Sequence, residues 1–126
     1  MSKGVIYIVT GEKYINEALI SAASLKDKMP NLPITLFSSE EVNSELFNEV
    51  ILIKNPQSEY GIIGKINQVR YISQTPYKET LFLDTDTYIC HNFVERFTML
   101  KNFDIAVAHA PNIIAYQVEN VPKSFP

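Results

Sequence analysis

Short hydrophobic runs alternate along the chain with stretches in which hydrophobic residues recur every three or four positions. The first run, VIYIVT at 5–10, is apolar, rich in β-branched residues and ended by Gly11. Such a run is typical of a strand buried on both faces. The next hydrophobic residues have helical spacing and predict an amphipathic helix that Pro30 and Pro33 end. This stripe consists of Ile15, Ala18, Leu19, Ala22, Leu25 and Met29.

The same alternation continues through the rest of the chain. Ser38 and Glu41 have the spacing of a capping box that would open a short helix through Val42 and Leu46. Polar residues at 57–64 predict a loop, and 111–126 form an irregular tail with three prolines. The predicted strands are 34–37, 50–53, 80–83 and 105–108, and the later helices are 66–73 and 93–100.

This order of elements predicts one α/β domain over residues 1–126, with a Rossmann-like parallel sheet and right-handed crossovers. In such sheets, ligands bind beyond the carboxyl ends of the strands. The positions to examine are therefore Thr10–Gly11, Ser38–Ser39 and above all Asp84–Asp86.

Composition narrows the class of protein. The 126 residues are 46% hydrophobic and 20% charged, as in an ordinary globular domain, and the net charge of -3 argues against a general nucleic-acid binder. The single cysteine, Cys90, excludes an internal disulfide and a cysteine-built zinc site, and we expect it to be buried. No run is long enough to span a membrane and the start has no signal-peptide pattern, so we expect a cytoplasmic domain.

The strongest chemical signal is LFLDTDTYI at 81–89. Alternate residues of a strand point the same way, so Asp84 and Asp86 are expected to converge on one cation at the strand end. Two carboxylates leave room for a diphosphate on Mg²⁺ or Mn²⁺, which would neutralise a leaving phosphate. The competing interpretation is a plain turn, in which Asp and Thr are common.

Other candidates carry weaker signals. Lys65 and Arg70 precede the Asp84–Asp86 strand on a predicted helix and are candidates for phosphate contacts, or belong to a solvated helix face. Gly11 permits close approach of a ligand and Tyr14 offers a stacking face for a base. The two histidines, His91 and His109, are more often structural or exposed than ligands.

The stretch GKINQVRYISQTPYKETLFLDTDTYICHNF at 64–93 resembles the glycosyltransferases of the GT-A fold, particularly the glycogenin-like family 8 group and its bacterial galactosyltransferase relatives. VIYIVTGEKYINEALISAASLK at 5–26 is similar to that group's first strand and helix, and FDIAVAHAP at 103–111 to the strand after its D-x-D motif. The resemblance implies a GT-A fold and retaining, Mn²⁺- or Mg²⁺-dependent transfer of a hexose from a UDP-sugar.

Residue by residue, the resemblance assigns Asp84 and Asp86 to the metal and the diphosphate. It assigns Lys65 to the donor and Ser38 to the surroundings of the base. The full nucleotide-sugar set that it implies is Val9, Thr10, Gly11, Tyr14, Ser38, Lys65, Asp84, Thr85 and Asp86.

The chain also departs from the family pattern. Family members continue into an acceptor-binding half with a late metal-binding histidine, which we expect to be absent from 1–126, so that self-association follows from the exposed surface. The alternative function is a binding-only or truncated module without transferase activity. A haloacid dehalogenase-type phosphatase is disfavoured because 83 residues precede Asp84. A pyrophosphorylase is disfavoured because the loop TGEKY at 10–14 lacks the required glycine-rich, arginine-bearing form.

Overall fold

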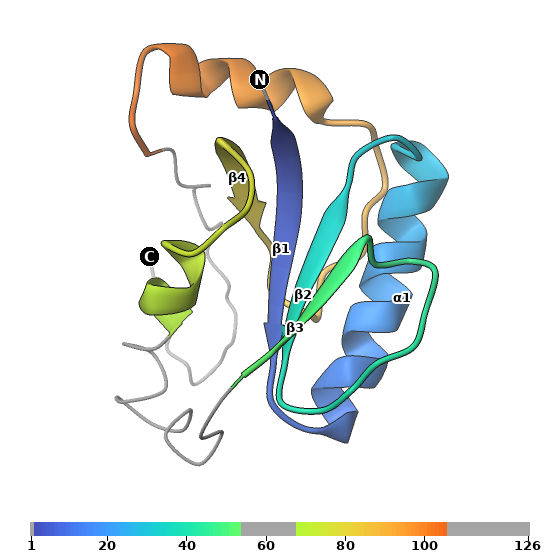
Figure 1. Ribbon diagram of the computed structural model, residues 1–126. Helices are drawn as coiled ribbons and strands as arrows, with labels where there is room; N and C mark the ends of the chain where they lie inside the picture. Colours follow the sequence, from blue (N-terminus) through green and yellow to red (C-terminus); the bar gives the residue numbers. More distant parts are fainter. Residues whose placement is uncertain (1, 54–67, 106–126) are drawn as a thin grey trace, which may run out of the picture.

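Four strands form a parallel sheet at the centre of the structure (Figure 1). The computed structural model describes residues 2–53 and 68–105. The strands are β1 (Lys3–Val9), β2 (Ile34–Ser38), β3 (Glu49–Leu52) and β4 (Glu79–Phe82), in the spatial order β3-β2-β1-β4. Each neighbouring pair is parallel, which confirms the predicted α/β class with a Rossmann-like sheet.

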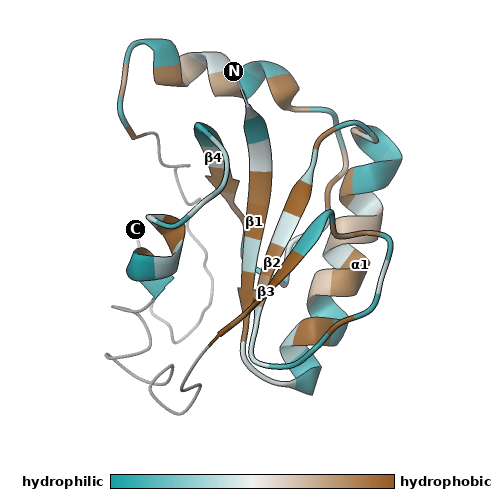
Figure 2. Cartoon of the chain, viewed as in Figure 1, coloured by the Kyte–Doolittle hydropathy of each residue, from teal (hydrophilic) through white to brown (hydrophobic). Residues whose placement is uncertain are grey.

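The two inner strands carry the most continuous hydrophobic sequence because both of their faces are covered. Every β1 residue from Gly4 to Val9 is buried, and so is every residue of β2. Val5 lies between Ile34 of β2 and Leu81 of β4 in the register of the sheet. Figure 2 shows this hydrophobic centre along β1. The outer strands β3 and β4 are only partly buried.

Helix α1 (Glu12–Lys28) covers one face of the sheet (Figure 1). It begins after Gly11, whose φ of 118° lies in the region that glycine favours. Its buried residues are spaced three or four apart, as the sequence predicted, and they meet the β1 side chains of one face. The cluster on this face includes Val5, Tyr7, Val9, Ile15, Ala18, Ala22, Leu25, Ile34 and Leu36.

The other face of the sheet has a second, smaller cluster. It contains Ile6, Ile8 and Phe37, with Tyr71 and Ile72 of the helical residues 68–72 packed against it. The Phe37 and Tyr71 rings are stacked with centroids 5.6 Å apart. The predicted helix at 66–73 is therefore confirmed over the part that the structure describes.

Close packing under Tyr77 requires a glycine on β1. The Tyr77 ring lies against Gly4, where a Cβ atom would overlap it. The Tyr77 hydroxyl and Thr35 Oγ1 are hydrogen-bonded at 2.7 Å on the same face. Gly4 therefore has a packing role, whereas Gly11 has a conformational one.

The chain after β4 turns back along α1 toward the amino ends of the strands. There the 3-10 helix η2 (Val94–Lys101) lies across the end of the sheet, and its Phe97 joins the α1-side cluster (Figure 1). This element confirms the helix predicted at 93–100, in a tighter form than an α-helix. No helix within 2–53 and 68–105 is long and apolar enough to cross a membrane.

One predicted helix is wrong. Residues 39–48 form no helix, because Ser38 ends β2 and its Oγ is occupied by the Glu40 main chain, accepting from N at 3.1 Å and donating to O at 2.6 Å. Val42 and Leu46 pack against the α1-side cluster without helical structure. The loop predicted at 57–64 and the tail at 111–126 lie outside the described residues, as does all but Ile105 of the strand predicted at 105–108.

Candidate functional site at the carboxyl edge of the sheet

The order of the strands defines where a ligand is most readily held. From β1 the chain proceeds outward through β2 and β3, and then crosses to β4 on the other side of β1. The strand order therefore reverses between β1 and β4. Loops that leave neighbouring strands in opposite directions at such a switch point open a crevice beyond their carboxyl ends. The loops at this switch point are Thr10–Gly11, after β1, and the turn that begins at Asp84, after β4.

The loop after β1 is fixed by the neighbouring loop after β2. Gly11 N donates a hydrogen bond to Ser39 Oγ at 3.1 Å, and Ser39 N donates to Val9 O at 3.1 Å. A Cβ atom added to Gly11 would meet no described atom within 4 Å. The glycine is therefore required by its backbone angle, and the space in front of it is open to a close-approaching group.

Asp84 and Asp86 lie on a turn. β4 ends at Phe82, Leu83 N still donates to Ile6 O at 3.1 Å, and the turn is centred on Thr85 and Asp86. Strand alternation is therefore the wrong reason for expecting the two carboxylates to converge. Both carboxylates are exposed on this turn.

The carbonyl oxygen of Asp84 closes the turn. It accepts from Thr87 N at 3.3 Å and from Thr87 Oγ1 at 2.8 Å. Beyond the turn, Thr87 Oγ1 contacts Ser21 Oγ at 3.0 Å, and Ser21 Oγ contacts the hydroxyl of Tyr7 at 2.7 Å. These contacts connect the carboxylate turn to the buried centre of the sheet.

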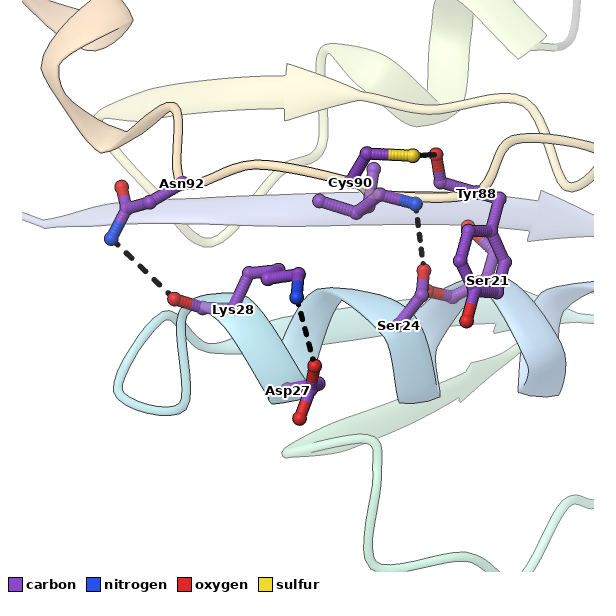
Figure 3. Close-up of polar contacts among 8 residues, drawn as sticks. Ser21, Ser24, Asp27, Lys28, Tyr88, Cys90 and Asn92 are labelled. Carbon is purple, nitrogen blue, oxygen red and sulfur yellow. Dashed lines mark hydrogen bonds and ion pairs between the residues drawn. The ribbon is translucent and has the colours of Figure 1, made fainter.

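A row of polar contacts, here called the polar ladder, attaches the segment after β4 to helix α1. Thr85 Oγ1 donates to Glu17 Oε1 at 2.8 Å. In the later part of the row, Ile89 N donates to Ser24 Oγ at 2.8 Å and Asn92 Nδ2 to the Lys28 carbonyl at 3.4 Å. Figure 3 shows Ser24, Lys28 and Asn92 in this part of the row. The ladder pairs Glu17, Ser21, Ser24 and Lys28 of α1 with Thr85, Thr87, Ile89 and Asn92 of the segment.

The polar ladder arises from matching periodicities. Its helix residues are three or four positions apart and therefore share one face of α1. In the segment after β4, the ladder residues Thr85, Thr87 and Ile89 are two positions apart, as residues on one side of an extended chain are. Ser21 and Ser24 are buried, so each needs hydrogen-bond partners that compensate for lost water. The segment after β4 supplies them, and the carboxylate turn is thereby held in one place.

The side chains proposed from the sequence for nucleotide binding differ in their accessibility. Val9 is buried against α1, so only its main chain faces the loop. Ser38 is also buried, and its hydroxyl is occupied by the Glu40 main chain. Tyr14 is 44% exposed at the start of α1, with Lys13 Nζ 5.6 Å from its ring centroid. Thr10 is half-buried beside Gly11.

The structure describes only part of the charged and metal-binding candidates. Lys65 and His109 lie outside the described residues, whereas Arg70 and His91 are exposed. Cys90 is exposed as well, which contradicts its expected burial, because the neighbouring Ile89 takes the inward position on the segment. Its thiol makes a long 3.9 Å contact to the Tyr88 carbonyl.

The donor set at the turn suits a hard divalent cation. Two exposed carboxylates, Asp84 and Asp86, offer the oxygen ligands that Mg²⁺ and Mn²⁺ prefer, and leave coordination positions for a phosphate. Within 2–53 and 68–105, no group of three His, Cys, Asp or Glu side chains is arranged to hold a metal. By their chemistry alone, the two carboxylates fit a hard divalent cation.

Two residues near the site were missed by sequence reasoning: Glu17 and Ser21, which hold the turn after β4. Ser39, one of the strand-end positions that the sequence pointed to, contacts the Gly11 loop. A signal for Ser21 was present, because a serine beside Ala18, Ala22 and Leu25 on an apolar helix stripe requires a polar partner.

Comparison with known proteins assigns no family. No family model matches the chain, and no curated protein matches it. The fold and the site define an α/β domain with a parallel sheet and a carboxylate turn at its switch point.

Proposed function

We propose that this domain is the nucleotide-sugar-binding part of a metal-dependent glycosyltransferase of the GT-A type. It would transfer a hexose from a UDP-sugar to an acceptor. The observation that carries the proposal is the position of Asp84 and Asp86, directly after β4 and across the switch point from Gly11. Ligands of Rossmann-like sheets bind at such a crevice.

The chemistry of the turn supports a diphosphate rather than an uncharged ligand. Asp84 and Asp86 would hold Mn²⁺ or Mg²⁺, which supplies charge neutralisation for the departing nucleoside diphosphate. Gly11 leaves open space for the nucleotide, and the exposed ring of Tyr14 offers a stacking surface for the base. Lys65 is proposed to contact the donor through the resemblance alone.

Calorimetric titration of UDP into the protein, with Mn²⁺ and separately with EDTA, tests the proposal. We expect binding that requires Mn²⁺ and that Asp86→Asn abolishes, because the substitution removes one of two carboxylate ligands. Asp104→Asn is the matched control, since Asp104 is also exposed but follows η2 at the other end of the sheet. Absence of binding to the folded wild-type protein would refute the proposed donor site.

Turnover separates the transferase from the binding-only module. Release of UDP from UDP-glucose or UDP-galactose is measured with wild-type protein and with Asp86→Asn. Metal-dependent release that the substitution removes supports the transferase. Tight binding without release or transfer supports the binding-only alternative.

A further inference from the structure

The contacts behind the carboxylate turn form a directed chain of hydroxyl groups. The Asp84 carbonyl oxygen can only accept, so Thr87 Oγ1 donates its hydrogen to it at 2.8 Å. With that hydrogen used, Ser21 must donate in its 3.0 Å contact with Thr87. Tyr7 must in turn donate in its 2.7 Å contact with Ser21. Each hydroxyl has one hydrogen, so the order of donors is fixed.

We propose that Tyr7, Ser21 and Thr87 are positioning residues that hold the Asp84–Asp86 turn through this hydroxyl chain. Tyr7 and Ser21 are fully buried on a central strand and its covering helix, and therefore provide a rigid anchor. Thr87 joins these two residues to the main chain of Asp84, because its hydroxyl contacts both Ser21 Oγ and the Asp84 carbonyl oxygen. Hydrogen bonds in such a chain polarise and strengthen one another. The inference rests on the proposed function in one respect, that the turn binds a ligand. The effect of the hydroxyl chain on the order of the turn can be measured without any ligand.

Tyr77 supplies a matched control on the opposite face of the sheet. Its hydroxyl also makes a 2.7 Å contact with another side-chain hydroxyl, that of Thr35 on β2. Tyr77→Phe therefore removes a comparable hydrogen bond that has no connection to the carboxylate turn. Thr87 offers a second pair: Thr87→Val removes the hydroxyl and keeps the shape, whereas Thr87→Ser keeps the hydroxyl.

Amide hydrogen exchange in the ligand-free protein tests the chain. The readout is the exchange rate of the Thr87 amide, which donates to Asp84 O, divided by that of the Leu83 amide, which donates to Ile6 O in the sheet. Division by the Leu83 rate corrects for openings that expose the turn and the sheet together. We expect Thr87→Val and Tyr7→Phe to raise the ratio about fivefold, as loss of one ordinary hydrogen bond allows. Thr87→Ser and Tyr77→Phe should leave it unchanged.

The outcomes separate this inference from the proposed function. Equal ratios in Thr87→Val and Thr87→Ser, or in Tyr7→Phe and Tyr77→Phe, overturn the hydroxyl chain whether or not UDP binds. Titration of UDP with Mn²⁺ into the same four variants gives a second readout, and weaker binding confined to Thr87→Val and Tyr7→Phe supports the positioning role. Failure of the wild-type protein to bind UDP refutes the donor site, while the exchange ratio still decides the hydroxyl chain.

Discussion

Thr85, between the two carboxylates of the turn, donates its hydroxyl to Glu17 Oε1 on helix α1 at 2.8 Å. Its side chain is therefore directed to the helix, while Asp84 and Asp86 are exposed. The middle residue of D-x-D is thus an attachment point in this protein. The polar ladder begins at this contact and continues along α1.

The Glu17–Thr85 contact is expected to contribute to stability as a coupled pair. In a double-mutant cycle of Glu17→Ala and Thr85→Val, we expect a coupling free energy of about 1 kcal/mol, since a part-buried hydrogen bond is lost with either partner. Urea unfolding measures it. The exposed Glu12 on the same helix is the control, and its substitution should be additive with Thr85→Val. Additivity for Glu17 as well would show that the contact contributes nothing.

We expect Ser24 to contribute to the stability of the fold through two buried hydrogen bonds. Its Oγ donates to the Ser21 carbonyl at 2.6 Å and also accepts from Ile89 N at 2.8 Å in a buried position. Ser24→Ala leaves that buried amide without an acceptor, which we expect to lower the free energy of unfolding by about 1–3 kcal/mol.

Ser73 is the matched control for this prediction. It makes the same kind of contact, to the Arg70 carbonyl at 2.6 Å, but at an exposed position. Ser73→Ala is expected to change the free energy of unfolding by less than about 0.5 kcal/mol. Similar values for the two serines in chemical denaturation would contradict a role for Ser24 in holding the Ile89 amide.

One buried and one half-buried tyrosine, Tyr7 and Tyr77, are expected to limit stability in alkali. Burial raises the pKa of Tyr7, although its hydrogen bond with Ser21 lowers it in part. Burial also raises the pKa of Tyr77, where the bond with Thr35 opposes the shift and the negative charge of Glu49 adds to it. The unfolded chain ionises its tyrosines near pH 10, about where an unperturbed tyrosine titrates. The stability due to both neutral groups is thus complete below about pH 10 and declines as the pH rises toward their folded pKa values.

Ultraviolet difference spectroscopy of the phenolate measures this effect. Tyr7 and Tyr77 should ionise above the ordinary tyrosine range and together with unfolding. Tyr7→Phe and Tyr77→Phe should each make the free energy of unfolding less dependent on pH above about pH 10. Ionisation of both groups near pH 10, where an unperturbed tyrosine titrates, and without unfolding would refute the prediction.

Much of the sheet could be predicted because its signals are local and strong. The run at 5–10 is apolar on both faces of β1, and the stripe from Ile15 to Leu25 has helical spacing. Together the two patterns favour a helix packed on a buried strand. The helix predicted through Val42 and Leu46 was wrong because its sequence signal was weak. A capping box describes spacing alone, whereas the Ser38 hydroxyl had a closer partner in the main chain of Glu40.

The position of the carboxylates could be predicted, but their support could not. Hydrophobic residues up to Leu83 placed Asp84 at the carboxyl end of a strand, which is where the structure has it. The turn depends instead on Glu17 and Ser21, whose partnership with Thr85 and Thr87 is set by tertiary packing. No short-range pattern relates these positions.

The polar ladder joins residues that are very far apart in sequence: its contacts span from 68 positions, for Thr85 and Glu17, to 64, for Asn92 and Lys28. Contacts of this separation form only after a large loop has closed, and their loss of chain entropy must be offset by the rest of the fold. An intermediate made of β1, α1, β2 and β3 alone would therefore have an ordered sheet and no ordered carboxylate turn. We therefore expect the carboxylate turn to lose its fixed position whenever the segment after β4 detaches from α1, even where β1, β2 and β3 stay paired.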